Sequence, residues 1–236
     1  MELLTILATC AALLTTAKPP ETVIHETDCK NAKLQYQAIM RKIVLTEQER
    51  DAIARVAYAE AANQGDGGIA AVVYTIINRL ISNQFGDSIT DIINAPHQFE
   101  PAHKAGGWQH LPKHTQEQQA RVDTIINLAL AGHLPDVTKG ALFFQNPKIV
   151  RQREKQGRVS AGLTDFGNSK RTTVIKDHAF YSSINMKKKR HPVKQPNKLN
   201  GEQSVADWDI YGKERLNTYQ EKAQSWDVFS GEGSVR

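Results

Sequence analysis

Six apolar residues between positions 69 and 80 constrain the fold more than any other feature. Their spacing of i, i+3, i+4, i+7, i+8 and i+11 places them on one stripe of an α-helix: Ile69, Val72, Val73, Ile76, Ile77 and Leu80. Such a stripe leaves water only by packing against other elements. We therefore expect a central helix that is buried in the core of a mainly helical domain.

Capping signals predict two further helices. Thr46 with Glu49, and Thr115 with Gln118, have the spacing of a capping box, in which each side chain bonds the backbone N–H of the other residue. We expect the helix that begins after Thr46 to run up to a glycine-rich break at 65–68.

The remaining segments complete an α+β domain, mainly helical, with a small β-sheet. A short helix is expected at 88–94, and the aromatic and apolar segments 140–145 and 177–182 are typical of strands that could pair with each other. Segments 96–112 and 148–170 lack periodicity. We interpret the first as a long surface loop and the second as an exposed excursion.

Composition divides the chain into four parts. Residues 1–17 are apolar and end in small residues, as in a signal peptide or short hydrophobic segment. Residues 18–44 are interpreted as a linker with a short helix around 32–42. Residues 45–185 are the predicted folded domain, and 186–236 a basic and polar C-terminal tail.

The N-terminal segment favours export to the periplasm or cell envelope. Glu2 stands where a basic residue is usual, and the segment is too short to span a bilayer comfortably as a permanent anchor. Transient membrane contact through this end is left open. Cys10 and Cys29 both precede the first convincing helix, so no disulfide framework is expected to hold the core, and we expect a monomer.

The charge balance limits the classes of partner. The net charge of +5 and the pI near 9.1 favour a polyanion, either nucleic acid or an acidic wall polymer. Four of the positive charges lie in the run Lys187–Arg190, which lacks interleaved aromatic residues. Because no helix-turn-helix or zinc-finger spacing is present either, we expect no nucleic-acid partner.

Glu60 is the candidate for acid–base chemistry. It follows Ile53, Val56 and Ala57 at helical spacing, so it shares their apolar face. A carboxylate facing a core is costly unless it is paired or keeps its proton, and a protonated carboxyl group can act as a general acid. The alternative is a glutamate that the last turn of the helix merely exposes.

Histidines raise the alternative of a metal site. His97, His103, His110 and His114 fall close together, and the last two have i, i+4 spacing. Pro112 between them disfavours a helix that would hold both rings on one face, and no H-E-x-x-H motif is present. We expect no metal and no other cofactor.

Five blocks of sequence occur in a distinctive order: Ala57-Tyr-Ala-Glu60-Ala, Ala70-Ala-Val-Val-Tyr-Thr-Ile-Ile-Asn78-Arg79, Gln98-Phe99, Gly140-Ala-Leu-Phe-Phe-Gln-Asn146-Pro147 and His178-Ala-Phe-Tyr181. Over residues 50–182, the chain resembles the SleB-like cell wall hydrolases, the family of spore-cortex-lytic enzymes. The resemblance implies that residues 45–185 form a lysozyme-like catalytic domain.

The same resemblance implies a lytic transglycosylase that cleaves the β-1,4 bond between N-acetylmuramic acid and N-acetylglucosamine in peptidoglycan and leaves 1,6-anhydro ends. Glu60 falls on the family's catalytic glutamate. Family members often have a second glutamate four positions later, followed by a proline, where this chain has Gln64 and Gly65. A role for a second carboxylate at that position is therefore in doubt.

A hydrolytic mechanism would need another carboxylate, and Asp66, Glu100 or Asp177 could provide it. The alternatives to a transglycosylase are a hydrolytic muramidase or glucosaminidase, and a non-catalytic murein-binding or virion-structural protein. Spore germination, wall remodelling and a role as a phage virion or lysis protein would all use this chemistry.

The matching blocks also supply candidates for substrate contact: Gln98, Phe99, Asn146, His178 and Tyr181. They combine apolar faces with hydrogen-bonding tips, which suits sugar rings. The alternative is structural: Phe99 and Tyr181 would be core residues, and Asn146 part of a turn. Asn78 and Arg79 are expected to hold neighbouring loops rather than to touch substrate.

Overall fold

The computed structural model describes residues 3–13, 24–96 and 98–184. Eight α-helices are described in this part of the chain: α1 (Leu3–Leu13), α2 (Glu26–Met40), α3 (Glu47–Ala61), α4 (Gly65–Ser82), α5 (Ile89–Asn94), α6 (Glu100–Ala105), α7 (Gln116–Leu130) and α8 (Pro147–Lys155). Short 3₁₀ turns η1 (Ala62–Gln64), η2 (Trp108–His110) and η3 (Leu163–Asp165) accompany the strands β1 (Phe143–Gln145), β2 (Arg171–Ile175) and β3 (His178–Tyr181). The predicted tail 186–236 lies outside the described residues.

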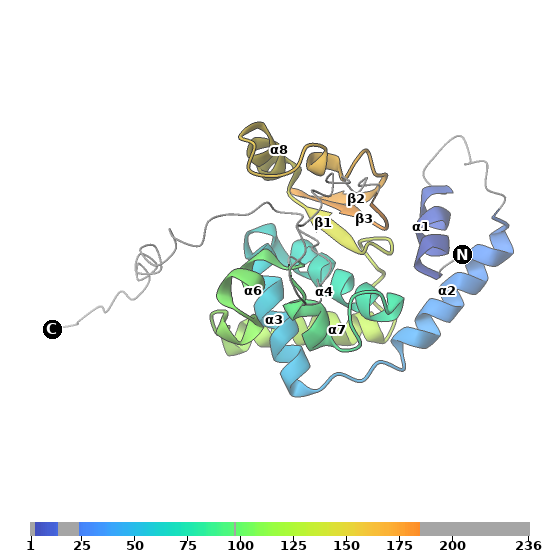
Figure 1. Ribbon diagram of the computed structural model, residues 1–236. Helices are drawn as coiled ribbons and strands as arrows, with labels where there is room; N and C mark the ends of the chain where they lie inside the picture. Colours follow the sequence, from blue (N-terminus) through green and yellow to red (C-terminus); the bar gives the residue numbers. More distant parts are fainter. Residues whose placement is uncertain (1–2, 14–23, 97, 185–236) are drawn as a thin grey trace, which may run out of the picture.

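Helix α4 is the buried centre of the fold, as predicted. Every residue from Gly68 to Arg79 is buried, and α3, α5 and α7 pack around the helix (Figure 1). The expected break at 65–68 is narrower than predicted, because α4 already begins at Gly65. That residue has a φ of 65°, which favours glycine, so the change of direction needs one residue only.

Both predicted capping boxes are confirmed. The backbone N–H of Glu49 donates to Thr46 Oγ1 at 3.2 Å, and the Thr46 N–H donates to the Glu49 carboxylate at 2.9 Å. Thr115 and Gln118 make the same exchange at the start of α7. Local sequence signals therefore place the two long helices that pack against α4.

The predicted pairing of the two aromatic segments is also confirmed. Strand β3 lies between β1 and β2 in an antiparallel sheet, with Phe144 opposite Phe180. Strand β2 was not foreseen, and neither was helix α8 within the segment interpreted as an exposed excursion. Together with η3 they surround a second, smaller core of Val150, Leu163, Phe166, Ala179 and Tyr181. We call residues 143–181 the sheet lobe; it lies beside the helical part in Figure 1.

The prediction of a long surface loop over 96–112 is wrong. The segment contains α6 and η2, and it buries Phe99, Ala102 and Trp108 in the main core. The six-residue helix α6 is too short to show a repeating apolar stripe, and Gly106 ends it with a φ of 76°. Periodicity could not reveal it.

Helices α1 and α2 form a pair at the side of the domain (Figure 1). The segment interpreted as a linker thus contains a helix of 15 residues, whose Tyr36 and Met40 join the main core. Leu4 of α1 joins it too. Among the described residues, no helix is both long and apolar enough to cross a membrane.

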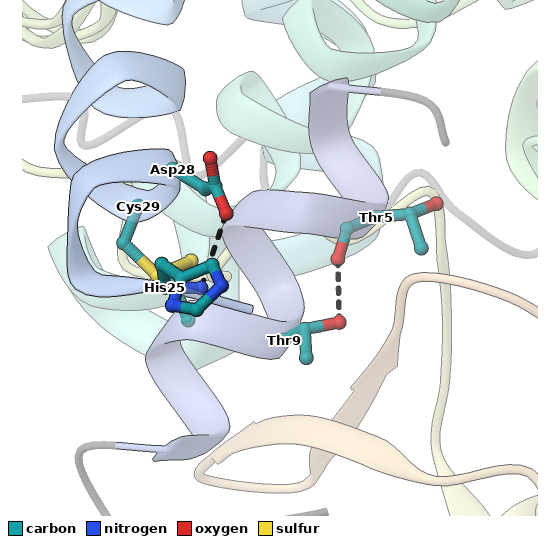
Figure 2. Close-up of a disulfide and its surroundings, with 6 residues drawn as sticks. Thr5, Thr9, His25, Asp28 and Cys29 are labelled. Atoms are coloured by element: carbon teal, nitrogen blue, oxygen red, sulfur yellow. Dashed lines mark hydrogen bonds between the residues drawn. A yellow bond between two sulfur atoms is a disulfide. The ribbon is translucent and has the colours of Figure 1, made fainter. Parts of the chain in front are cut away.

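A disulfide joins this pair, which the sequence analysis did not foresee. Cys10 of α1 bonds Cys29 in the first turn of α2 (Figure 2). Figure 2 also shows the cap of α2, where the His25 N–H donates to the Asp28 carboxylate at 3.1 Å. The bond lies outside the core around α4, and its role is to tie α1 to the rest of the protein.

Replacing both Cys10 and Cys29 by serine is expected to lower the midpoint of thermal unfolding. The bond closes a loop between residues 19 positions apart, and closing a loop of that size stabilises a protein by about 3 kcal/mol. A reducing agent should lower the midpoint of the wild type similarly and leave the double variant unchanged. An equal midpoint for the oxidised wild type and the double variant would contradict the expectation.

Candidate active site

Glu60 lies in the last turn of α3, where its side chain is partly buried at the edge of the core and surrounded by protein atoms. Burial is the largest cause that raises the pKa of Glu60, to about 8, and the negative charge of Glu100 adds to it. The positive charge of Arg79 and a hydrogen bond from the Glu100 backbone N–H act in the opposite direction. Since burial dominates, Glu60 keeps its proton at neutral pH, as a general acid must.

Glu100 is the second carboxylate beside Glu60. It is the first residue of α6, and burial works to raise its pKa. Ion pairs with Lys104 at 2.7 Å and Arg153 at 3.2 Å outweigh burial and hold the pKa below its usual range. The two carboxyl groups therefore differ in charge at neutral pH, one protonated and one ionised.

The other two carboxylates considered for a second role are engaged elsewhere. Asp66 is exposed and pairs with Arg121 at 3.2 Å. Asp177 pairs with Lys148 at 3.2 Å, and its pKa is lowered mainly by that hydrogen bond and by one from Gln64. Neither contributes to the shift of Glu60.

Gln64, which stands where the resemblance implies a second glutamate, has a structural role. It is buried, its side-chain oxygen accepts the Asp177 N–H at 3.2 Å, and its amide faces the Asp177 carboxylate at 3.5 Å. An amide can donate and accept in this way, whereas a glutamate would place a second negative charge against Asp177. Gln64 thus ties the end of η1 to the turn between β2 and β3.

Asn78 and Arg79 hold neighbouring loops, as predicted. The Arg79 side chain is buried, donates to the Leu142 carbonyl at 2.8 Å, and lies 4.8 Å from the ring centres of both Phe85 and Phe99. Asn78 accepts the Tyr36 hydroxyl at 2.8 Å and donates to the Ala141 carbonyl at 3.2 Å. Sequence reasoning did not anticipate that Arg79 also acts electrostatically on Glu60.

His178 is buried at the start of β3. Burial is the main cause that lowers its pKa, against the charge of Asp177, so the ring is neutral at pH 7. Its Nδ1 has no hydrogen-bond partner among the described residues. The ring packs 5.3 Å from Phe144, which in turn lies 6.3 Å from Phe99, so an aromatic row leads from His178 to the residue before Glu100.

The other predicted contact residues support the structural alternative. Phe99 and Tyr181 are fully buried in the two cores. Asn146 caps α8, where its side chain accepts the N–H groups of Lys148 and Ile149. Gln98 is half-buried in the turn before α6, where its N–H donates to the Ala95 carbonyl at 3.2 Å.

The sequence analysis missed the cations around Glu100. Lys104 could have been found, because it follows Glu100 at i, i+4 spacing on a helix. Arg153 left no such signal, since it comes from α8, in a segment that was interpreted as an exposed excursion. Only the packing of the sheet lobe brings Arg153 to this site.

The histidines do not converge in the part of the chain that the structure describes. His110 contacts the Gly106 carbonyl at 3.2 Å, and His114 lies 3.5 Å from the Asp51 carboxylate. Across residues 3–13, 24–96 and 98–184, no group of three or more histidine, cysteine or acidic side chains could hold a metal ion. His97 lies outside these ranges.

Comparison with known proteins relates this chain to a protein family. A family model described as cell wall hydrolase matches residues 63–181, about half of the chain. The match begins just after Glu60 and includes Arg79, Glu100, Arg153 and His178. No curated protein and no solved structure matched.

Replacing Glu60 by glutamine is expected to stabilise the protein progressively as the pH rises. Between pH 4.5 and about 8 the unfolded chain releases the Glu60 proton while the folded protein retains it, so the wild type loses stability across this window. The difference in free energy of unfolding should reach a few kcal/mol and level off above that pKa. Urea unfolding at a series of pH values measures it.

The matched control is Glu47→Gln, an exposed glutamate at the start of the same helix. Its stability curve should run nearly parallel to that of the wild type. A stability difference for Glu60→Gln that does not vary with pH would contradict the raised pKa of Glu60.

Proposed function

Because this chain belongs to the cell wall hydrolase family, we propose that it cleaves the glycan strands of peptidoglycan with Glu60 as the general acid. The observation that carries the proposal is the pair of carboxyl groups: Glu60, whose pKa is raised to about 8, beside the ionised Glu100. Cleavage of a glycosidic bond requires a group that protonates the departing oxygen, and a carboxyl group held in its acid form at neutral pH is suited to that task.

The proposed reaction is that of a lytic transglycosylase. Glu60 donates its proton to the glycosidic oxygen between N-acetylmuramic acid and N-acetylglucosamine, and the C1–O bond breaks as positive charge develops at the muramyl C1. The Glu60 carboxylate then takes the proton of the muramyl C6 hydroxyl as O6 bonds to C1. This closes a 1,6-anhydro ring, consumes no water and restores the protonated Glu60.

Hydrolysis is the second candidate, and Glu100 is the observation that favours it. An ionised carboxylate beside the acid could activate a water molecule or attack C1 directly, as in two-carboxylate glycosidases. Its pairing with Lys104 and Arg153 weakens it as a base or nucleophile, because both cations stabilise the ionised form. For this reason we favour the single-acid mechanism.

Digestion of purified sacculi tests the proposal. The wild type is expected to release muropeptides with anhydro ends, which are lighter by one water than hydrolytic products. Glu60→Gln should lower the rate by about 10²- to 10⁴-fold, since the amide cannot donate the proton. Glu47→Gln should cleave as the wild type does.

Reducing-end products alone would overturn the transglycosylase mechanism but retain a glycosidase. Full activity of Glu60→Gln would overturn the role of Glu60. Binding of sacculi without any cleavage would favour a structural murein-binding protein.

We also propose that the enzyme works outside the cytoplasm with helix α1 still attached. The Cys10–Cys29 disulfide supports an oxidising compartment. Cys10 and the buried Leu4 both precede the expected cleavage point near Ala17, so cleavage there before the disulfide forms would remove both from the protein. If α1 is retained, its residue Leu4 can stay packed in the main core, as the structure shows it.

Protein recovered from the periplasm of an expressing bacterium is expected to keep its N-terminal residues. Its intact mass should lie two hydrogens below that of the same sample after reduction, because the disulfide is closed. Mass spectrometry with N-terminal sequencing measures both. A chain that begins near residue 18 would contradict the retention of α1.

A further inference from the structure

Arg153 reaches Glu100 from a different part of the fold. Its Nη1 donates to both carboxylate oxygens of Glu100, at 3.2 Å each. Arg153 lies on α8, which packs on the core of the sheet lobe, whereas Glu100 begins α6, which packs on the main core. This contact therefore couples the orientation of the sheet lobe to the position of a carboxylate in the candidate active site.

The position of Glu100 matters because two charges of opposite sign act on Glu60. Arg79 is buried and fixed by its bond to Leu142, and its positive charge favours loss of the Glu60 proton. The negative charge of Glu100 opposes Arg79, and this effect grows as the two carboxyl groups approach. A Glu100 that is held in place therefore adds to burial in offsetting Arg79.

The second cation on Glu100 does not connect this carboxylate to the sheet lobe. Lys104 is on the same helix, four residues on, and its side chain is about half exposed. Lys104 contacts Glu100 Oε1 from the same helix, whereas the half-buried Arg153 contacts both oxygens from the sheet lobe. The two cations therefore hold Glu100 from different elements, Lys104 from α6 and Arg153 from α8.

We propose that Arg153 is a positioning residue that holds the Glu100 carboxylate in place beside Glu60, so that the packing of the sheet lobe fixes the negative charge next to the acid. This inference rests on the proposed function of Glu60. It adds that α8, which carries no residue of the acid–base step, controls the acid through Glu100. The working pH of the enzyme then depends on how the two cores are joined.

Direct titration of Glu60 tests the inference without any measurement of activity. In the folded protein, the Glu60 carboxyl carbon can be followed by NMR against pH, with Glu60→Gln used to assign its signal. Glu100→Gln removes the opposing negative charge and should lower the pKa of Glu60 by about one unit. Arg153→Met should lower it as well, because Glu100 then turns toward Lys104.

The sign of the Arg153→Met shift decides between two roles. If Arg153 acted only as a nearby positive charge, removing it would raise the pKa of Glu60, so a rise or no change overturns the proposal. In the double variant Glu100→Gln/Arg153→Met, the shift should equal that of Glu100→Gln alone, since Arg153 acts through Glu100. Additive shifts would also overturn it.

Two further variants control for charge and folding. Lys155→Met removes an exposed cation from the same helix and should leave the pKa of Glu60 unchanged. Arg153→Lys keeps the charge but loses the two-oxygen contact, so it should give a smaller shift in the same direction. It also provides the measurement if Arg153→Met fails to fold.

The pH profile of sacculus cleavage separates failure of the inference from failure of the proposed function. In the wild type, activity should fall as the pH rises through about 8, where Glu60 loses its proton. This limb should move to lower pH in Arg153→Met and stay in place in Lys155→Met. An inactive Glu60→Gln with an unmoved limb in Arg153→Met overturns only the role of Arg153, whereas an active Glu60→Gln overturns the proposed function itself.

Discussion

The buried polar end of helix α4 is the interaction on which the rest of the structure depends. Asn78 and Arg79 are buried in the last turns of a largely apolar helix, and each must find partners because an unpaired buried polar group costs several kcal/mol. Asn78 finds them in α2 and in the loop before β1, and Arg79 in the Leu142 carbonyl and three aromatic rings. These contacts connect the N-terminal helices, the central helix and the sheet lobe.

The same constraint creates an electrostatic problem at the candidate active site. A fixed cation near Glu60 favours the ionised carboxylate, which is the wrong form for a general acid. Burial of Glu60 and the negative charge of Glu100 outweigh Arg79, and the proton is retained. Arg79 thus holds the structure together through its buried contacts, while the burial of Glu60 and the charge of Glu100 offset the effect of its positive charge on Glu60.

Two polar contacts join the sheet lobe to the helical part near this site: Gln64 bonds Asp177, and Arg153 bonds Glu100. A third, from Arg79 to Leu142, holds the residue just before the lobe. Gln64 follows Glu60 by four residues, and Glu100 donates its backbone N–H to the Glu60 carboxyl group, so two of these contacts start next to Glu60. Such contacts explain why Gln64 is suited to its position: the amide serves the junction between the lobes, where a second carboxylate would face Asp177.

The sequence by itself determined the central helix, the capped starts of α3 and α7, and the pairing of β1 with β3. These features depend on residue spacing and local hydrogen bonds, which are visible within a single segment. It also pointed to Glu60, because a carboxylate on an apolar face is conspicuous. It did not predict α6 and α8, which are too short to show a clear repeating pattern. It also did not predict the Cys10–Cys29 disulfide, because nothing in the sequence around either cysteine indicates that the two come together.

Only the tertiary structure decided which carboxylate accompanies Glu60. Asp66, Glu100 and Asp177 were equivalent in sequence, because the field of a charge depends on distance in space and on burial. Packing placed Glu100 beside Glu60, turned Phe99 and Tyr181 into core residues, and brought Arg153 across from α8. The sequence pointed to Glu60 as the candidate acid, whereas the environment that raises its pKa arises from residues that meet only after the two cores have packed together.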